Sequence, residues 1–132
     1  KTGSKAISSP ITEVSEIFAP LLSKIESYKH PDYYLQSMLY STIVSRSGKF
    51  NPQGIAVSPA LIFIQRAFCD DYDSTIKIGK EAVTDISAFD NEYREQLGKL
   101  LGEMFDSSKP FSPTPDEELC KYCPYKALCN RQ

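Results

Sequence analysis

The sequence lacks any long hydrophobic run. None of its apolar stretches approaches the roughly 20 residues that a helix needs to span a bilayer. A secretory signal is also missing, because residues 1–5 are polar and no apolar stretch follows them directly. We therefore expect neither a membrane-spanning segment nor export through a signal peptide.

The chain carries little net charge. The formal value of -2 gives no overall attraction to nucleic acid, although a local basic patch would not show in this sum. Hydrophobic residues make up 41% and charged residues 24%, which is ordinary for a soluble globular protein. With 132 residues, the chain has the length of one domain and can bury a core without crosslinks.

Cysteines are few and unevenly placed. Cys69 stands alone, whereas Cys120, Cys123 and Cys129 fall within ten residues. Small secreted proteins usually spread their cysteines through the chain as a disulfide framework. The clustering instead indicates metal ligands in a reducing compartment, and we expect a cytoplasmic protein.

Helices are expected at both ends of the chain. Ser9 and Pro10 have the residue types of an N-cap and a first helical position, and Pro20 should kink or interrupt the helix that follows. A second helix is expected at about 32–47, before a loop of turn-forming residues at 47–54. A third should begin at a capping Asp90, and its predicted core face is Tyr93, Leu97, Leu100, Leu101, Met104 and Phe105.

Strands are expected in the middle of the chain. Residues 55–68 are rich in β-branched, aromatic and aliphatic types and predict one strand, or two broken near Pro59. Residues 70–73 predict a turn, and residues 75–78 and 82–86 predict short strands, paired as a hairpin around Gly79 and Lys80. This order of elements predicts an α/β or α+β fold.

The cysteine tail has the spacing C-x2-C-x5-C. Two thiolates separated by two residues can bind one metal centre, and the third can return to it after a turn that begins at Pro124. Tetrahedral zinc and a four-iron cluster each take four protein ligands, so a fourth must come from elsewhere. The candidates are Cys69, His30 or a cysteine outside this sequence. Free or partly oxidised thiols packed beneath the last helix are the structural alternative.

The tail resembles a known motif. Residues 120–126 read Cys-Lys-Tyr-Cys-Pro-Tyr-Lys, similar to the C-terminal iron–sulfur segment of RecB-like nucleases of the PD-(D/E)XK superfamily, including the AddB type. In that group one cysteine before the nuclease core and three after it hold a 4Fe–4S cluster. The resemblance implies that Cys120, Cys123 and Cys129 are cluster ligands here, with structural zinc as the alternative.

Two further matches follow the same family order. Gln36 and Tyr40 fit the family's Q-x3-Y motif, and residues four apart project from one helix face. Their amide and phenol can bond to a DNA phosphate without adding charge. The chain opens Lys1-Thr2-Gly3, similar to the Asp-Tyr-Lys-Thr-Gly of RecB-like nucleases. The resemblance therefore implies that Lys1, Gln36 and Tyr40 are catalytic-site residues; an ordinary amphipathic helix and a plain turn are the structural alternatives.

The resemblance covers essentially the whole chain and implies a partial restriction-endonuclease-like fold. Residues 1–132 would be the C-terminal portion of the nuclease domain, with a helical part at 1–54, strands at 55–89, and the last helix and cysteine cluster at 90–132. It implies a bacterial Mg²⁺- or Mn²⁺-dependent DNA exonuclease of repair and recombination, working with a helicase or helicase–nuclease partner.

The acidic metal ligands of such an enzyme would precede Lys1, and the chain does not begin with Met, so we expect an excised piece that is inactive alone. Asp70, Asp71 and Asp73 could bind a hard cation, but a solvated turn is the simpler interpretation. Glu13 and Glu16 are most simply charges near a helix N-terminus.

Two other functions stay open. One is a non-catalytic module that binds nucleic acid or protein, with a structural metal held by the cysteines. The other is a cysteine-cluster protein unrelated to nucleases. A brown, iron-loaded preparation favours the nuclease, and a colourless, zinc-loaded one favours the binding module.

Overall fold

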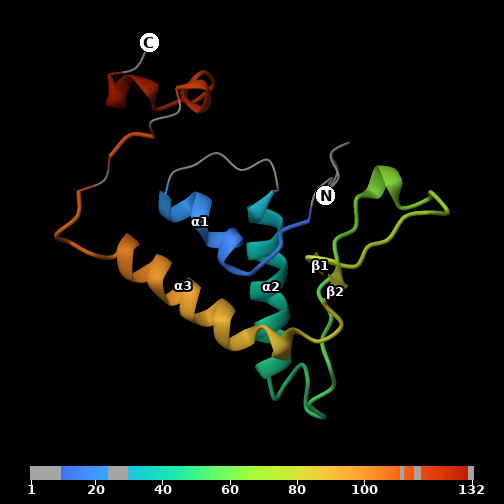
Figure 1. Cartoon of the computed structure of the whole chain (residues 1–132). Coiled ribbons are helices and arrows are strands. Elements are labelled where there is room, and N and C mark those ends of the chain that lie inside the picture. The colour runs from blue at the N-terminus through green and yellow to red at the C-terminus, as the bar shows by residue number, and fades with distance from the viewer. Residues whose placement is uncertain (1–9, 24–29, 111, 115–116, 131–132) are drawn as a thin grey trace.

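The computed structural model describes residues 10–23, 30–110, 112–114 and 117–130 (Figure 1). Among these residues, the body consists of helices α1 (Ser15–Ser23), α2 (Pro31–Arg46) and α3 (Asp90–Met104) and a hairpin of β1 (Lys77–Ile78) and β2 (Glu81–Ala82). Short 3-10 turns lie in the connections: η1 (Ile64–Arg66), η2 (Ile86–Ala88), η3 (Glu118–Cys120) and η4 (Lys126–Cys129). The expected mixture of helices with a small sheet is confirmed.

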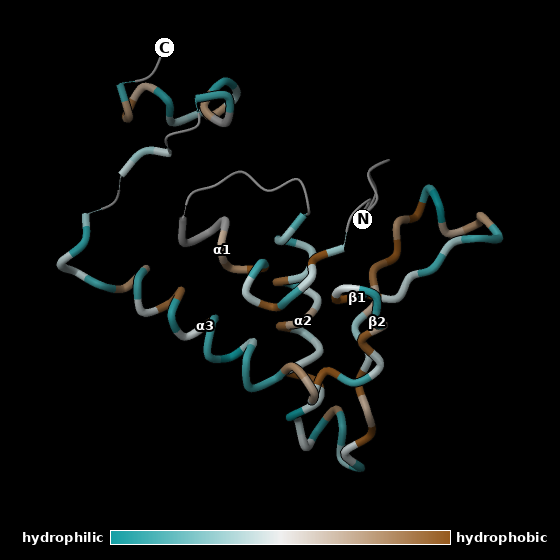
Figure 2. The backbone as a smooth tube through the Cα atoms, in the orientation of Figure 1, coloured by the Kyte–Doolittle hydropathy of each residue, from teal (hydrophilic) through white to brown (hydrophobic). Residues whose placement is uncertain are grey.

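The hydrophobic core lies where the three helices meet the hairpin. Phe18 of α1 packs against Tyr93 of α3, with ring centroids 5.4 Å apart, and Met38 of α2 is fully buried. Figure 2 shows hydrophobic stretches gathered in this region, whereas most of α3 is hydrophilic. The buried residues of the core are Ile11, Val14, Ile17, Phe18, Tyr34, Met38, Ile76, Ile78, Val83, Ile86 and Tyr93.

Helix α2 begins and ends within one residue of its predicted bounds. His30 precedes it in the left-handed region, with φ 52°, and Pro31 occupies the first turn, where its missing N–H costs nothing. The helix ends at Arg46, and the loop at 47–54 is closed by Asn51. The Asn51 amide both accepts from the N–H of Ile55 at 2.8 Å and donates to its carbonyl at 2.9 Å.

The first helix begins later than the sequence predicts. Ser9 lies outside the described residues, and Ile11 forms a parallel bridge with Ile78 instead of entering a helix. The Ile11 carbonyl accepts a hydrogen bond from the N–H of Gly79 at 2.6 Å, so the backbone at Ile11 pairs with the hairpin. Helix α1 starts at Ser15 and continues through Pro20, so the predicted start and the predicted interruption at Pro20 are wrong.

The predicted strand at 55–68 is also wrong. The segment contains an isolated bridge from Ala60 to Thr75 and the 3-10 turn η1, but no strand is assigned anywhere in it. The backbone N–H of Leu61 donates to the carbonyl of Ser74 at 2.8 Å, so one edge of the segment 55–68 is partly paired. The residue types alone favour a strand here, but a strand also needs a continuous hydrogen-bonded partner. The backbone pairing with residues 74–75 does not continue past the bridge.

The hairpin is confirmed in a shorter form. Lys77 pairs with Ala82 and Ile78 with Glu81, and Gly79 has φ 63°, a value that the tight turn requires and that glycine adopts without strain. Ile86, predicted as the end of the second strand, begins η2 instead.

Helix α3 begins at Asp90, but the predicted capping role of Asp90 is wrong, because Phe89 is the N-cap residue and no side chain caps the helix. Only the first part of the expected core face is buried. Tyr93 is buried, and Leu97 and Leu100 pack against the core. Leu101, Met104 and Phe105 are 42%, 52% and 79% exposed, which contradicts their predicted place in the core. The reason is length: α3 has 15 residues, whereas α1, which packs on it, has nine.

Within the described part of the chain, no helix is both long and apolar enough to cross a membrane.

Candidate functional site

Helix α2 has a buried side and an exposed side, and the exposed side includes the apolar Ile43 and Val44. Tyr34, Met38, Ser41 and Thr42 are buried, whereas Gln36 is exposed and Tyr40 is 58% exposed. The Gln36 amide nitrogen donates to the Tyr40 hydroxyl at 3.3 Å. The two side chains therefore share one helix face and touch, as their spacing of four predicted. Their part in a reaction stays a prediction.

The geometry of this pair leaves donors available. Because the Tyr40 oxygen accepts from Gln36, its own proton can be donated to another group, and the Gln36 amide keeps a second N–H. Two uncharged donors on one exposed helix face suit phosphate oxygens of a nucleic-acid backbone. The pair can hold such a group in place but cannot itself cleave a phosphodiester bond.

Lys1, the third predicted catalytic residue, lies outside the described residues. Its position relative to Gln36 and Tyr40 therefore stays a prediction.

The cysteine tail forms consecutive turns. The N–H of Cys123 donates to the carbonyl of Cys120 at 3.0 Å, and the N–H of Lys126 donates to the carbonyl of Cys123 at 3.3 Å. Cys129 closes η4. All four cysteines of the chain are in the described residues, and none forms a disulfide. Figure 1 shows the tail, in red, apart from the helices of the body.

The two candidates for a fourth ligand lie elsewhere. Cys69 is exposed in the loop after η1, and the His30 ring stacks on Tyr33 at a centroid distance of 5.0 Å and an angle of 9°. Among the described residues, no three His, Cys, Asp or Glu side chains form a group that could hold a metal ion. The predicted ligand set of Cys120, Cys123 and Cys129 therefore stays a prediction.

Asp73, one of the acidic residues after η1, is already paired with a lysine. The Asp73 carboxylate pairs with Lys77 at 2.7 Å and accepts from the N–H of Thr75 at 2.9 Å. The hydrogen bond from Lys77, followed by those from Thr75, holds the pKa of Asp73 well below its usual range. Asp73 is thus neutralised by a lysine, which favours the solvated-turn interpretation over a cation site.

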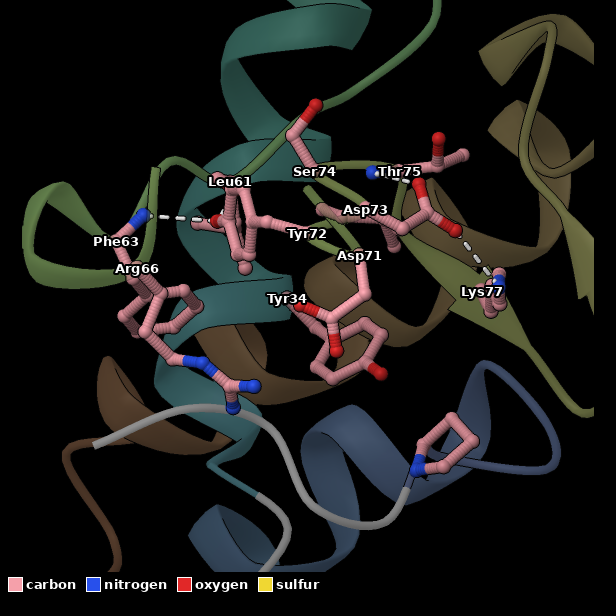
Figure 3. Close-up of a pocket in the computed structure, with 12 residues that line it drawn as sticks. Tyr34, Leu61, Phe63, Arg66, Asp71, Tyr72, Asp73, Ser74, Thr75 and Lys77 are labelled. Atoms are coloured by element: carbon pink, nitrogen blue, oxygen red, sulfur yellow. Dashed lines mark hydrogen bonds and ion pairs between the residues drawn. The ribbon is translucent and has the colours of Figure 1, made fainter. Parts of the chain in front are cut away.

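A cavity of about 230 Å³ lies between Tyr34 of α2, the segment around η1 and the turn before β1 (Figure 3). The sequence did not predict it, because its walls come from segments that only the tertiary fold brings together. The Tyr72 hydroxyl fixes one wall: it accepts from the N–H of Phe63 at 2.8 Å and donates to the carbonyl of Leu61 at 2.6 Å.

The charges that line this cavity cancel. Arg66 and Lys77 contribute two positive charges, and Asp71 and Asp73 contribute two negative charges. Burial raises the pKa of Tyr34, so its hydroxyl stays protonated. A balanced lining does not attract a polyanion.

A family comparison agrees with the motif order. The model of the PD-(D/E)XK nuclease superfamily matches residues 19–130, a range that includes Gln36, Tyr40 and the three tail cysteines. No curated protein and no solved structure matches the chain significantly. The family match covers most of the sequence, and the chain therefore belongs to the PD-(D/E)XK nuclease superfamily.

Proposed function

We propose that this chain is part of a metal-dependent DNA nuclease of the RecB-like, AddB-type group, acting in DNA repair and recombination with a helicase partner in the cytoplasm. The observation that carries the proposal is the exposed, hydrogen-bonded pair of Gln36 and Tyr40 within the family match. Its spacing fits the Q-x3-Y motif, and its two free donors suit a DNA phosphate.

Each predicted site residue has a distinct part. Gln36 and Tyr40 hold the DNA backbone against α2, and the Lys1 ammonium orients the attacking water or stabilises charge on the phosphate. A bound Mg²⁺ or Mn²⁺ would supply a water of lowered pKa and would neutralise charge on the phosphoryl oxygens. No described residues form a carboxylate group that fits such an ion. We therefore expect the 132-residue chain alone to leave DNA uncut.

The tail is proposed to hold a 4Fe–4S cluster through Cys120, Cys123 and Cys129. The donor chemistry fits, because three thiols that are in no disulfide follow one another in short turns. Such a cluster would crosslink the tail to the segment that provides its fourth ligand.

A second candidate is a non-catalytic module that binds nucleic acid and uses structural zinc. It is favoured by one observation: in the residues that the structure describes, no acidic group fits a catalytic metal. Iron content and visible absorbance separate the candidates, since zinc proteins are colourless.

The proposal is tested with linear DNA and the purified 132-residue chain. We expect no cleavage with Mg²⁺ or Mn²⁺, and robust cleavage would contradict our assignment of the metal ligands. For duplex binding, Gln36→Ala should weaken affinity roughly two- to tenfold, the value of one hydrogen bond. Gln53→Ala removes an exposed amide from the 47–54 loop and is the matched control, expected to bind normally. Equal binding by both variants would remove the main support for the nuclease.

A further inference from the structure

The cavity beside Tyr34 combines apolar walls with charged groups (Figure 3). Leu61, Phe63 and Ile76 supply apolar surface, and Phe63 and Ile76 are buried side chains of the body. The volume of about 230 Å³ lies below the roughly 300–1,000 Å³ of sites that hold drug-sized ligands. The cavity therefore suits a smaller molecule, one that has an apolar part.

Two of the four charged side chains in the lining have no ion-pair partner among the described residues. Asp73 and Lys77 pair with each other at 2.7 Å. Across the described ranges, no ion pair joins Arg66 or Asp71 to another side chain. Figure 3 shows the Arg66 guanidinium and the Asp71 carboxylate extending in the same direction, and both residues are exposed. The lining thus offers one cation and one anion to a ligand.

A ligand that carries both charges fits these two groups best. A purely anionic ligand would be repelled by Asp71, and a purely cationic one would be repelled by Arg66. A guanidinium can bind a carboxylate through two parallel hydrogen bonds, and a carboxylate can accept from an ammonium group. A small zwitterion can therefore satisfy both side chains at once.

We propose that the cavity binds a free α-amino acid with an apolar side chain, its carboxylate on Arg66, its ammonium group on Asp71 and its side chain against Phe63. A nucleotide fits less well, because it would bring a phosphate dianion to a lining without net charge. This inference goes beyond the proposed nuclease function and does not depend on it.

The test titrates the ¹⁵N-labelled 132-residue chain with L-leucine at pH 7 and follows the amide chemical shifts by NMR. We expect saturable shifts in residues 61–77, which include most of the lining. N-acetyl-leucine lacks the ammonium group and leucinamide lacks the carboxylate, so each should bind at least tenfold more weakly, the value of a charge-assisted hydrogen bond. Glycine should also bind more weakly, because it has no side chain to bury against the apolar wall.

Substitutions of the two charged residues test the same contacts from the protein side. Arg66→Gln and Asp71→Asn should each weaken leucine binding at least tenfold, since each removes one charged partner. Arg66→Lys keeps the positive charge and should bind leucine more tightly than Arg66→Gln does. Asp70→Asn is the matched control: Asp70 is exposed next to Asp71 but does not line the cavity, so its replacement should leave binding unchanged.

Three results would overturn the proposal. They are the absence of saturable shifts with L-leucine, equal binding by Asp71→Asn and Asp70→Asn, and binding of leucinamide as tight as that of leucine. The dispersion of the amide signals shows whether each variant has stayed folded. The leucine analogues test the proposal on the native chain, so it can be refuted even where a variant fails to fold.

Discussion

Arg46, the last residue of α2, and Asp90, the first residue of α3, form an ion pair across 44 positions of sequence. The Arg46 Nε donates to one Asp90 carboxylate oxygen at 3.2 Å, and a terminal guanidinium nitrogen contacts the other oxygen. Asp90 is only 9% exposed, and Arg94 lies 3.8 Å from its carboxylate. The pair therefore joins the end of one helix to the start of another.

Replacing Asp90 with Asn should lower the free energy of unfolding by about 1–2 kcal/mol, between the small value of an exposed ion pair and the larger cost of breaking a buried one. Urea denaturation at pH 7 measures this. Glu95→Gln, which removes the exposed pair with Lys99, is the control and should change stability much less than Asp90→Asn does. An equal effect of both substitutions would contradict the structural role of Asp90.

The contribution of Asp90 should depend on pH. The hydrogen bond from Arg46 is the main cause that holds the pKa of Asp90 below its usual value. The stabilisation is thus complete above the unfolded pKa of about 3.9 and is lost as the pH falls through the lower folded pKa. The difference in unfolding free energy between the native chain and Asp90→Asn should therefore shrink below pH 4. A constant difference down to pH 2 would contradict this.

Tyr93→Phe should destabilise the protein by about 1 kcal/mol, because the buried Tyr93 hydroxyl donates to the carbonyl of Leu35 at 2.7 Å. Burial raises the pKa of Tyr93 to about 12, above the unfolded value of about 10. This contribution is present below pH 10 and is lost as the pH rises towards 12. Between pH 8 and pH 11, the free energy of unfolding should fall more for the native chain than for Tyr93→Phe. An identical fall in both proteins would contradict the prediction.

Tyr72→Phe tests what shapes the cavity. The substitution leaves the N–H of Phe63 and the carbonyl of Leu61 without their shared partner, so we expect a loss of about 1–3 kcal/mol. Amide hydrogen exchange should become faster around residues 61–63, while α3 keeps its protection. Unchanged exchange in that segment would show that the hydroxyl does not hold the cavity wall.

Local signals predicted the parts of the fold that depend on neighbouring residues. Pro31 and the loop formers after Arg46 set the bounds of α2, and Gly79 marked the hairpin. The segment at 55–68 failed because β-branched residues form a strand only beside a paired edge, and the composition does not reveal that edge. Ile11 was misassigned for the same reason, since its bridge to Ile78 is a contact across the fold.

The sequence predicted only the part of the candidate site whose geometry follows from the spacing of residues along a helix. Gln36 and Tyr40 touch because residues four apart on a helix are neighbours. Tyr34 and Lys77, by contrast, line one cavity although they lie far apart in the sequence, and this closeness depends on tertiary packing and has no counterpart in the sequence pattern.

Anaerobic reconstitution with iron, sulfide and an excess of an external thiol, which can act as the fourth ligand, should give the chain visible absorbance that Cys120→Ser removes, because two protein thiolates are too few to hold a cluster. Cys69→Ser is the control: Cys69 is exposed in a separate loop, and its replacement should leave the absorbance unchanged. Absorbance that depends on Cys69 would identify it as the fourth ligand, and colourless zinc binding would favour the non-catalytic module.

Cleavage of linear DNA by the longer nuclease of which we propose this chain to be a part, with and without Lys1→Ala, tests the nuclease assignment most directly. With Mg²⁺ or Mn²⁺, we predict rapid degradation by the native protein and a loss of about 100-fold or more in the variant, comparable to removing one group that stabilises charge in a transition state. Equal cleavage rates, or no cleavage by the native protein, would contradict the account.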